Sequence, residues 1–230
     1  MITKLNSEFK SSYSLYVVDT IPSTNTYLKE NSDLYPNKTC LIALEQTNGR
    51  GRYDRVWKSD NDIIFSILLK ENGNYQITTP LAVCYGLLDL GFDTKIKWPN
   101  DIYLKDKKLV GILIEDVFRD KFVSSVIGIG INLTDKPSYH AIGLNTNISK
   151  YLIIEKVLNR FEEFNKMDFS ELMELYKTKS MVLGKMVYYH DKTYLAYDID
   201  NTGYLILKNE EETIRISWDE INIKESLLWK

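Results

Sequence analysis

The sequence has few of the residues on which several common chemistries depend. Its 230 residues include two histidines, His140 and His190, and two cysteines, Cys40 and Cys84. This histidine content excludes a histidine-rich metal site and any mechanism that needs several histidines. Both cysteines lie in apolar contexts, so we expect small buried thiols and no disulfide framework.

Long hydrophobic runs and an excess of charge are also absent. No apolar run approaches the ~20 residues that cross a bilayer, and the first ten residues contain no apolar signal core. With so little cysteine, these features predict a protein of the reducing cytoplasm with no membrane partner. The 29 Lys and Arg residues against 32 Asp and Glu give a net charge of −3. That balance argues against a general nucleic-acid binder.

The most distinctive stretch, KWPNDIYLKDKKLVGILIE, covers residues 97–115. Pro99 fixes its own φ and favours extended backbone at Trp98, which gives the chain a stiff corner. A charged segment and an apolar strand rich in β-branched residues follow. The pattern predicts a hairpin on a rigid scaffold that presents four polar side chains, those of Lys97, Asn100, Asp101 and Lys108. An ordinary hairpin with a charged tip is the alternative.

A second feature, GRGRYDRVWK over residues 49–58, combines three arginines, one lysine and two glycines. Such a loop suits phosphate or carboxylate groups, and its like charges predict that it is mobile until an anion binds. The dinucleotide fingerprint is not met, because Asp54 stands at the third glycine position. A solvated arginine-rich turn and an RNA-contacting loop are the alternatives.

The remaining pattern alternates strands and helices up to about residue 180. We expect strands at 15–18, 39–45, 62–70 and 122–133, and helices at 24–31, 78–90, from 152 onward and at 170–179. Ser23 or Thr24 would cap the first helix, and Thr78 or Thr79 the second, with Pro80 in its first turn. Gly128 and Gly130 indicate a close approach to the strand backbone.

Beyond the expected boundary at 180–184 the pattern changes to short strands with tight turns. These strands are expected at 185–189, 194–197, 204–207 and 213–216. Close strands joined in this way predict a small antiparallel barrel.

Residues 97–101 (KWPND) and 108–115 (KLVGILIE) resemble the signature of the biotin–protein ligases. Residues 49–57 resemble that family's adenylate-binding loop, and the carboxy-terminal strands resemble its small SH3-like domain. Three further elements follow the family's order and spacing: Ser23-Thr24-Asn25, Gln46 and the GIGIN sequence of residues 128–132. The resemblance implies an α+β fold. A mixed central sheet with flanking helices, of the class II synthetase type, would span residues 1–180, with an SH3-like β-barrel over 181–230.

The sequence departs from the family pattern at three places. Asp54 replaces a usual loop glycine, Leu133-Thr134 follow Asn132 where a second asparagine is common, and Asp219-Glu220 stand where Gly-Glu is usual. Only about a dozen residues precede the first expected strand. The helix-turn-helix domain of repressor-type members is therefore not expected, and neither is DNA binding.

The resemblance implies two half-reactions. Biotin's carboxylate attacks the α-phosphorus of ATP and forms biotinoyl-AMP and pyrophosphate. A lysine of a biotin carboxyl carrier protein or domain, from acetyl-CoA or pyruvate carboxylase, then attacks the mixed anhydride. Mg²⁺ would neutralise the polyphosphate, without a dedicated protein metal site. The resemblance also allows a homodimer.

The resemblance assigns roles residue by residue. The catalytic set is Lys108, Asp101, Arg50 and Lys97. The biotin-binding set is Ser23, Thr24, Asn25, Gln46, Arg50, Gly51, Arg52 and Lys108. The nucleotide-binding set is Arg50, Arg52, Trp57, Asn100 and Asn132. Arginine and lysine charges would stabilise the anions of the first step, and Asp101 would take up the amine proton of the second. Lys97 would hold Asp101 ionised or touch the phosphates.

Two other functions fit parts of the sequence. A lipoate–protein ligase or octanoyltransferase shares the expected fold, although KWPND and the carboxy-terminal strands weigh against it. A non-enzymatic RNA-binding protein could use the arginine-rich loop and the small barrel. The net charge of −3 and the absence of a broad basic stripe weigh against that function.

Overall fold

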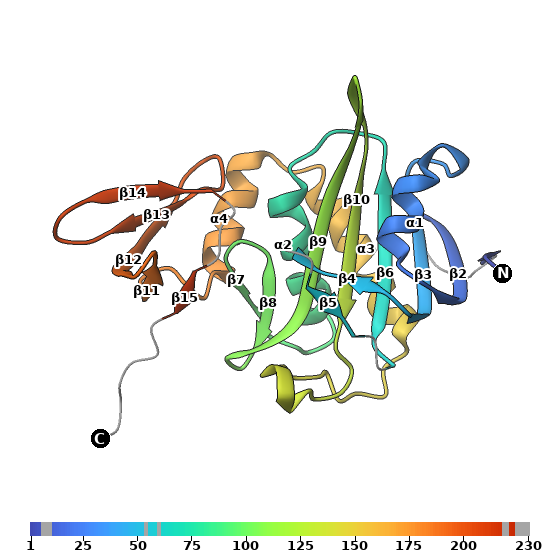
Figure 1. The fold of residues 1–230 in the computed structure, drawn as a ribbon, viewed down its shortest axis with the longest axis horizontal. Helices are drawn as coiled ribbons and strands as arrows, with labels where there is room; N and C mark the ends of the chain where they lie inside the picture. Colours follow the sequence, from blue (N-terminus) through green and yellow to red (C-terminus); the bar gives the residue numbers. More distant parts are fainter. Residues whose placement is uncertain (6–10, 53–54, 59–60, 218–220, 224–230) are drawn as a thin grey trace.

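The computed structural model describes residues 1–5, 11–52, 55–58, 61–217 and 221–223 (Figure 1). An eight-stranded mixed sheet runs through its centre in the order β1-β2-β3-β6-β10-β9-β8-β7. Its strands are β1 (Thr3–Lys4), β2 (Ser14–Ile21), β3 (Thr39–Gln46), β6 (Ile63–Leu69), β7 (Lys95–Lys97), β8 (Asp101–Leu104), β9 (Lys107–Arg119) and β10 (Lys121–Ile131). β2 and β3 pair in parallel, and the other neighbouring pairs are antiparallel. The expected mixed sheet is confirmed.

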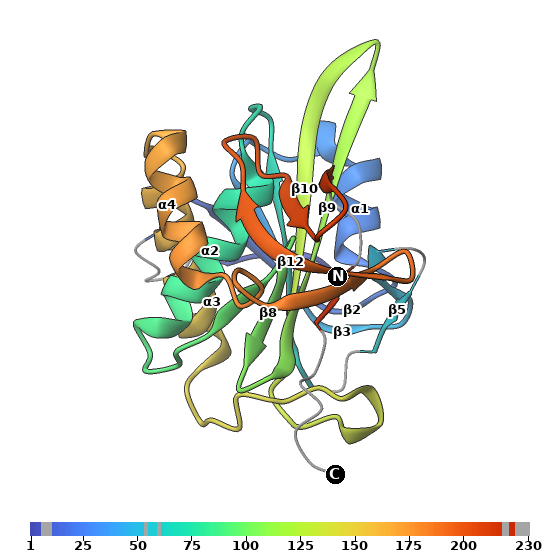
Figure 2. The same ribbon diagram turned by 90° about the vertical axis from the view of Figure 1, so that its left-hand side faces the viewer.

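Helices cover both faces of this sheet. They are α1 (Thr24–Glu30), α2 (Tyr75–Leu88), α3 (Lys150–Phe164) and α4 (Phe169–Lys179), with short 3-10 turns η1 (Ser32–Leu34) and η3 (Pro137–Tyr139). Figure 2 shows α2, α3 and α4 on one side of the sheet and α1 on the other. The apolar residues of α3 are buried at the spacing that the sequence predicts. None of the helices in the described ranges is long and apolar enough to cross a membrane.

The start of α2 differs from the expectation. The helix begins at Tyr75 with Asn74 as its N-cap, so neither Thr78 nor Thr79 is a cap and Pro80 lies inside the helix. The amides of Ile77 and Thr78 both donate to the Asn74 carbonyl. Tyr75 and Ile77 are buried. Burial of these two side chains therefore favours a helix that begins about a turn earlier than expected. Pro80 then lies past the first helical position, which is where proline usually stands.

The arginine-rich stretch also differs from an open loop. Its described residues form a small hairpin of β4 (Gly49–Arg50) and β5 (Val56–Trp57), and the amide of Gly51 donates to the Arg55 carbonyl at 2.7 Å. This hairpin lies over the same face of the sheet as α1 (Figure 2). The expected effect of Asp54 falls outside the described residues.

The carboxy-terminal strands form a five-stranded antiparallel sheet in the order β14-β13-β12-β11-β15. They are β11 (Met186–Tyr189), β12 (Lys192–Ile199), β13 (Leu205–Lys208), β14 (Thr213–Ile216) and β15 (Asn222–Ile223). The sheet contacts the main unit where the indole of Trp98 donates to the Gly203 carbonyl at 3.0 Å. The α+β fold class is confirmed, and the division near Ser180 stays a prediction.

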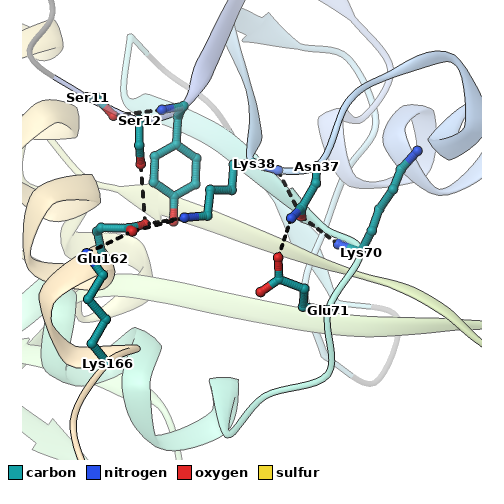
Figure 3. A network of polar contacts seen from close by, with 9 residues as sticks. Ser11, Ser12, Asn37, Lys38, Lys70, Glu71, Glu162 and Lys166 are labelled. Carbon is teal, nitrogen blue, oxygen red and sulfur yellow. Dashed lines mark hydrogen bonds and ion pairs between the residues drawn. The ribbon is translucent and has the colours of Figure 1, made fainter.

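Polar contacts fasten α3 to the start of β3 at one end of the main sheet (Figure 3). Lys38 Nζ lies 2.9 Å from the Glu162 carboxylate, which also accepts a hydrogen bond from Ser12.

Both cysteines are buried, Cys40 on β3 and Cys84 on α2. Burial raises the pKa of Cys84 to about 12. The expected buried thiols are confirmed, and neither is poised to act as a nucleophile.

Candidate active site

A cavity of about 310 Å³ lies between the sheet, the start of α1 and the β4–β5 hairpin. All the sequence-predicted site residues except Lys97 and Asn100 line it. These are Ser23, Thr24, Asn25, Gln46, Arg50, Gly51, Arg52, Trp57, Asp101, Lys108 and Asn132. Side chains from six separate stretches of the chain therefore meet in one place.

The KWPND corner is held from behind. Trp98 is 2% exposed and donates to Gly203 O, and the Tyr176 hydroxyl donates to the Pro99 carbonyl. This support places Asp101 at the first position of β8, opposite Lys97 of β7 in the antiparallel register. The corner is thus held by α4 and by the turn between β12 and β13, and the predicted rigidity of this scaffold stays a prediction.

Asp101 pairs across the β8–β9 hairpin with Lys108. The carboxylate oxygen Oδ1 lies 2.8 Å from Lys108 Nζ, and both side chains are about one third exposed. Lys97 Nζ stands 5.6 Å from the Tyr103 ring centroid and does not line the cavity. The described contacts thus bring Lys108 to Asp101 as its ion-pair partner.

Asn100 supports the site from below. It is 4% exposed, and its Nδ2 donates to the Ile112 carbonyl at 3.2 Å. Its Oδ1 accepts a long 3.5 Å hydrogen bond from Arg52. Asn100 therefore contacts a cavity-lining arginine instead of lining the cavity itself.

A neutral polar pocket forms at the α1 end of the cavity. Ser23 caps α1, with its Oγ accepting from the amide of Thr26 at 3.3 Å. The Gln46 side-chain oxygen accepts from both the amide and the hydroxyl of Thr24, at 2.7 and 3.0 Å. Of the two caps that the sequence offers for α1, the structure therefore shows Ser23.

Ser66 of β6 completes this pocket, and the sequence did not single it out. Its hydroxyl lies 2.7 Å from the Thr24 hydroxyl and donates to Asn25 Oδ1, also at 2.7 Å. The Asn25 amide is oriented by donation from Nδ2 to Glu115, and the Gln46 amide by the donor amide of Thr24. The Thr24 amide, the Thr24 hydroxyl and the Ser66 hydroxyl together give each oxygen acceptor of this network a donor.

Glu115, the last residue of the KLVGILIE motif, anchors the polar pocket to the arginine hairpin. Its carboxylate lies 2.6 Å from Lys29 Nζ, 3.0 Å from Asn25 Nδ2 and 3.7 Å from Arg50. Burial opposes ionisation, but the hydrogen bonds from Lys29 and Asn25 outweigh it and lower the pKa of Glu115. An ionised Glu115 thus fixes the orientation of Asn25.

Two glycines of β10 and one of β9 give side chains room to approach the sheet. A Cβ at Gly128 would lie 2.5 Å from Asn25 Oδ1. A Cβ at Gly130 or Gly111 would lie 2.5 or 2.7 Å from the Trp57 ring. The predicted close approach is confirmed, and its partners are these side chains. The Trp57 Nε1 group is buried without a hydrogen-bond partner among the described residues.

Positive charge dominates the rest of the lining. The cationic residues are Arg50, Arg52, Arg55, Lys58, Lys108 and Lys136, and among the described lining residues Asp101 is the only carboxylate. Such a wall favours a polyanionic ligand. No group of three or more His, Cys, Asp or Glu side chains in the described ranges could hold a metal ion.

Comparison with known proteins places this geometry in a family. The model of the biotin/lipoate A/B protein ligase family matches residues 17–132, and the chain belongs to that family. It is 30% identical over 217 residues to the bifunctional ligase/repressor BirA of Bacillus subtilis, covering 82% of this chain and 67% of the relative. It is 28% identical over 210 residues to the biotin–[acetyl-CoA-carboxylase] ligase of Mycobacterium tuberculosis, with 79% and 77% covered.

Solved structures give the same result. The biotin protein ligase of Aquifex aeolicus in complex with biotin and ATP superposes with a TM-score of 0.79 at 27% identity, covering 95% of this chain and all of that one. The biotin acetyl coenzyme A carboxylase synthetase of Helicobacter pylori, with bound biotinylated ATP, gives 0.69 at 25% identity, with 88% and 99% covered. The fold and family expected from the sequence are both confirmed.

Proposed function

We propose that this protein is an ATP-dependent biotin–protein ligase. It forms biotinoyl-5'-AMP and transfers biotin to a lysine of a biotin carboxyl carrier protein or domain. The observation that carries the proposal is that a neutral polar pocket and a cationic wall share one cavity. The named functions of the relatives support the same activity.

The neutral pocket favours biotin over lipoate. The hydroxyl and amide oxygens of this pocket belong to Thr24, Ser66, Asn25 and Gln46, and each can accept a further hydrogen bond. The ureido N–H groups of biotin can donate to these oxygens, whereas the dithiolane ring of lipoate has no N–H group. A site built to pair a ligand N–H rejects the analogue that lacks it, because buried polar atoms are left unpaired. Ser23 would serve the pocket by holding the start of α1.

The cationic wall serves the first half-reaction. Arg50, Arg52 and Lys108 line the cavity in which biotin's carboxylate and the α-phosphate would meet. Their charges offset the repulsion between these two anions, which is the main barrier. Gly51, which has no side chain, would let the hairpin backbone approach the ligand. Trp57 and Asn132 would contact the nucleoside, and Asn100 would position Arg52.

Mg²⁺ would reach the site with the nucleotide. Magnesium commonly binds substrate phosphates and waters with only one or two protein carboxylates. Asp101, the single carboxylate in the described lining, is paired with Lys108, so substrate phosphates and waters would hold the ion. The ion would neutralise polyphosphate charge.

In the second half-reaction Asp101 would accept the proton of the carrier lysine. That amine has a pKa near 10.4 in solution, so it must lose a proton before attack. Lys108 keeps the Asp101 carboxylate in place, and Lys97, opposite it in the register, would support the same corner. The carrier would belong to acetyl-CoA or pyruvate carboxylase.

One experiment tests this function directly. The protein is incubated with biotin, ATP, Mg²⁺ and a purified carrier domain, and the carrier mass is then measured. We expect the mass of one biotinyl group to be added, and no addition to a carrier whose acceptor lysine is replaced by arginine. Pyrophosphate exchange with lipoate in place of biotin tests the rival ligase. Pyrophosphate exchange that occurs with lipoate and not with biotin would overturn the proposal.

A further inference from the structure

Lys136 stands at the junction of two segments that cover the cavity. It follows β10 and η3 follows it, and its backbone pairs with Ala141 through two hydrogen bonds of 3.1 and 3.2 Å. The next residue, Ile142, donates to the Lys108 carbonyl at 3.0 Å. The backbone of Lys136 is therefore fixed relative to the Asp101–Lys108 pair.

The Lys136 side chain reaches across to the β4–β5 hairpin. Its Nζ donates to the Lys58 carbonyl at 2.8 Å and lies 5.9 Å from the Trp57 ring. In return, Lys58 Nζ lies 5.7 Å from the Tyr139 ring. Two lysines thus join the hairpin and the 133–141 segment in opposite directions.

A buried carboxylate holds Lys136 in this position. Asp62, at the start of β6, has a fully buried side chain that accepts from Lys136 Nζ through Oδ2 and from the Leu133 amide through Oδ1. Lys150 approaches the main-chain oxygen of Asp62 at 3.2 Å. The Lys136 side chain is 11% exposed, so water screens this pair little.

We propose that the Asp62–Lys136 ion pair is a positioning device that fastens the β4–β5 hairpin to the 133–141 segment. It acts on the nucleotide side of the cavity and sets how long the adenylate is retained between the half-reactions. The inference rests on the proposed function for the identity of the ligand, but the contacts that join the two segments lie within the chain. Neither Asp62 nor Lys136 enters the chemical steps.

The first test is hydrogen exchange in the ligand-free protein. Lys136→Met keeps the apolar stem and removes the charge, so exchange of the amides of Val56, Trp57 and Lys58 should become at least about 10-fold faster. Lys136→Arg keeps the cation and should restore slow exchange. Lys121→Met, at the exposed turn between β9 and β10, is the matched control and should leave exchange unchanged.

The second test measures ligand retention. Release of preformed biotinoyl-AMP should be about 10-fold faster in Lys136→Met, because loss of a buried charge partner acts on the dissociation rate. The KM for ATP should rise while the KM for biotin stays constant. A purely structural defect would change both constants.

Removing Lys136 alone leaves the Asp62 charge buried, which can prevent folding. The double variant Asp62→Asn/Lys136→Met removes both charges and gives the decisive measurement. If it folds and keeps unaltered exchange and adenylate release, the inference is wrong. Exchange needs neither biotin nor ATP. A protein that forms no adenylate would therefore refute the proposed function and leave the ion pair to be judged by exchange alone.

Discussion

The carboxylate of Asp101 and the ammonium group of Lys108 form one ion pair, with 2.8 Å between Oδ1 and Nζ. Lys108 is proposed to oppose the anions of the first half-reaction, and Asp101 to accept the proton of the second. An anionic substrate therefore competes with Asp101 for the charge of Lys108. The pair links the two steps, because each of its partners is proposed to act in one of them.

Substitution of each partner should separate the two half-reactions. Lys108→Ala should reduce biotinoyl-AMP formation by ~10²–10³, the scale for losing one well-placed electrostatic contact. Asp101→Asn should leave adenylate formation closer to normal and slow transfer by ~10²–10⁴, the scale for losing a general base. Single-turnover measurements of each step check this, with Lys105→Ala at the exposed β8–β9 turn as control.

The pH dependence of the Asp101→Asn variant gives an independent check. More of the carrier amine is already neutral at higher pH, so raising the pH should partly rescue the transfer step. Adenylate formation has no amine to deprotonate and should gain little. If Asp101→Asn instead loses mainly the first step, Asp101 serves ATP or its metal, and the proton leaves by another route.

Substitutions at Gly128 and Gly130 should distinguish the biotin side of the cavity from its nucleotide side. Alanine at Gly128 would press on Asn25, and alanine at Gly130 on Trp57, both at 2.5 Å. Overpacking costs about 1–3 kcal/mol, so each variant should raise one KM by about 10-fold. We expect Gly128→Ala to act on biotin and Gly130→Ala on ATP. Pyrophosphate-exchange kinetics measure both constants, and equal effects of both variants on both ligands would contradict the assignment.

The sequence predicted the parts of the site that depend on local pattern. Proline and charge within a few residues predict the KWPND corner. A β-branched run predicts the β9 strand, and the glycines of β10 predict a close approach to that strand. Ser66 was missed because one serine in the apolar run IIFSILL predicts only a buried strand. Its role needs Thr24, 42 positions away, which only the sheet brings near.

Longer-range relationships were beyond sequence reasoning for the same reason. Asp62 and Lys136 are 74 positions apart and meet because β6 pairs with β10. The Leu133 position, a departure from the family pattern, proves to donate its amide to Asp62. The departures at Asp54 and Asp219-Glu220 lie outside the described residues and remain untested. The cytoplasmic location, a homodimer and the lack of DNA binding also stay predictions.

Ser66 should contribute to the binding of biotin. Ser66→Ala removes the hydroxyl that donates to Asn25 and contacts Thr24, at a cost of about 1–3 kcal/mol. Biotin affinity, measured by titration calorimetry, should fall by about 10-fold, with little change for ATP. The control is Ser124→Ala on β10, because that buried hydroxyl has no hydrogen-bond partner in the described structure. If the Ser66→Ala protein binds biotin normally, Ser66 does not contribute to biotin binding.

Asp200 organises the turn whose Gly203 carbonyl holds Trp98. Its carboxylate accepts from the amide and hydroxyl of Thr202 at 2.8 and 2.7 Å and pairs with Arg215. Burial alone would raise the pKa of Asp200, but the hydrogen bonds from Thr202 and Arg215 outweigh it and lower the value from 3.8 to about 2. The ionised carboxylate therefore stabilises the folded chain at neutral pH.

The stabilisation by Asp200 should disappear in acid. Because the folded-state pKa is depressed, the contribution is complete above the unfolded-state pKa of 3.8 and is lost as the pH falls toward about 2. Asp200→Asn should therefore be less stable than the unaltered protein at neutral pH, and the gap should narrow as the pH falls below about 4. Urea unfolding across this pH series measures the gap. Asp120→Asn, at the exposed β9–β10 turn, should show no comparable gap. A gap for Asp200→Asn that stays constant with pH would mean that the carboxylate charge is not what holds the turn against Trp98.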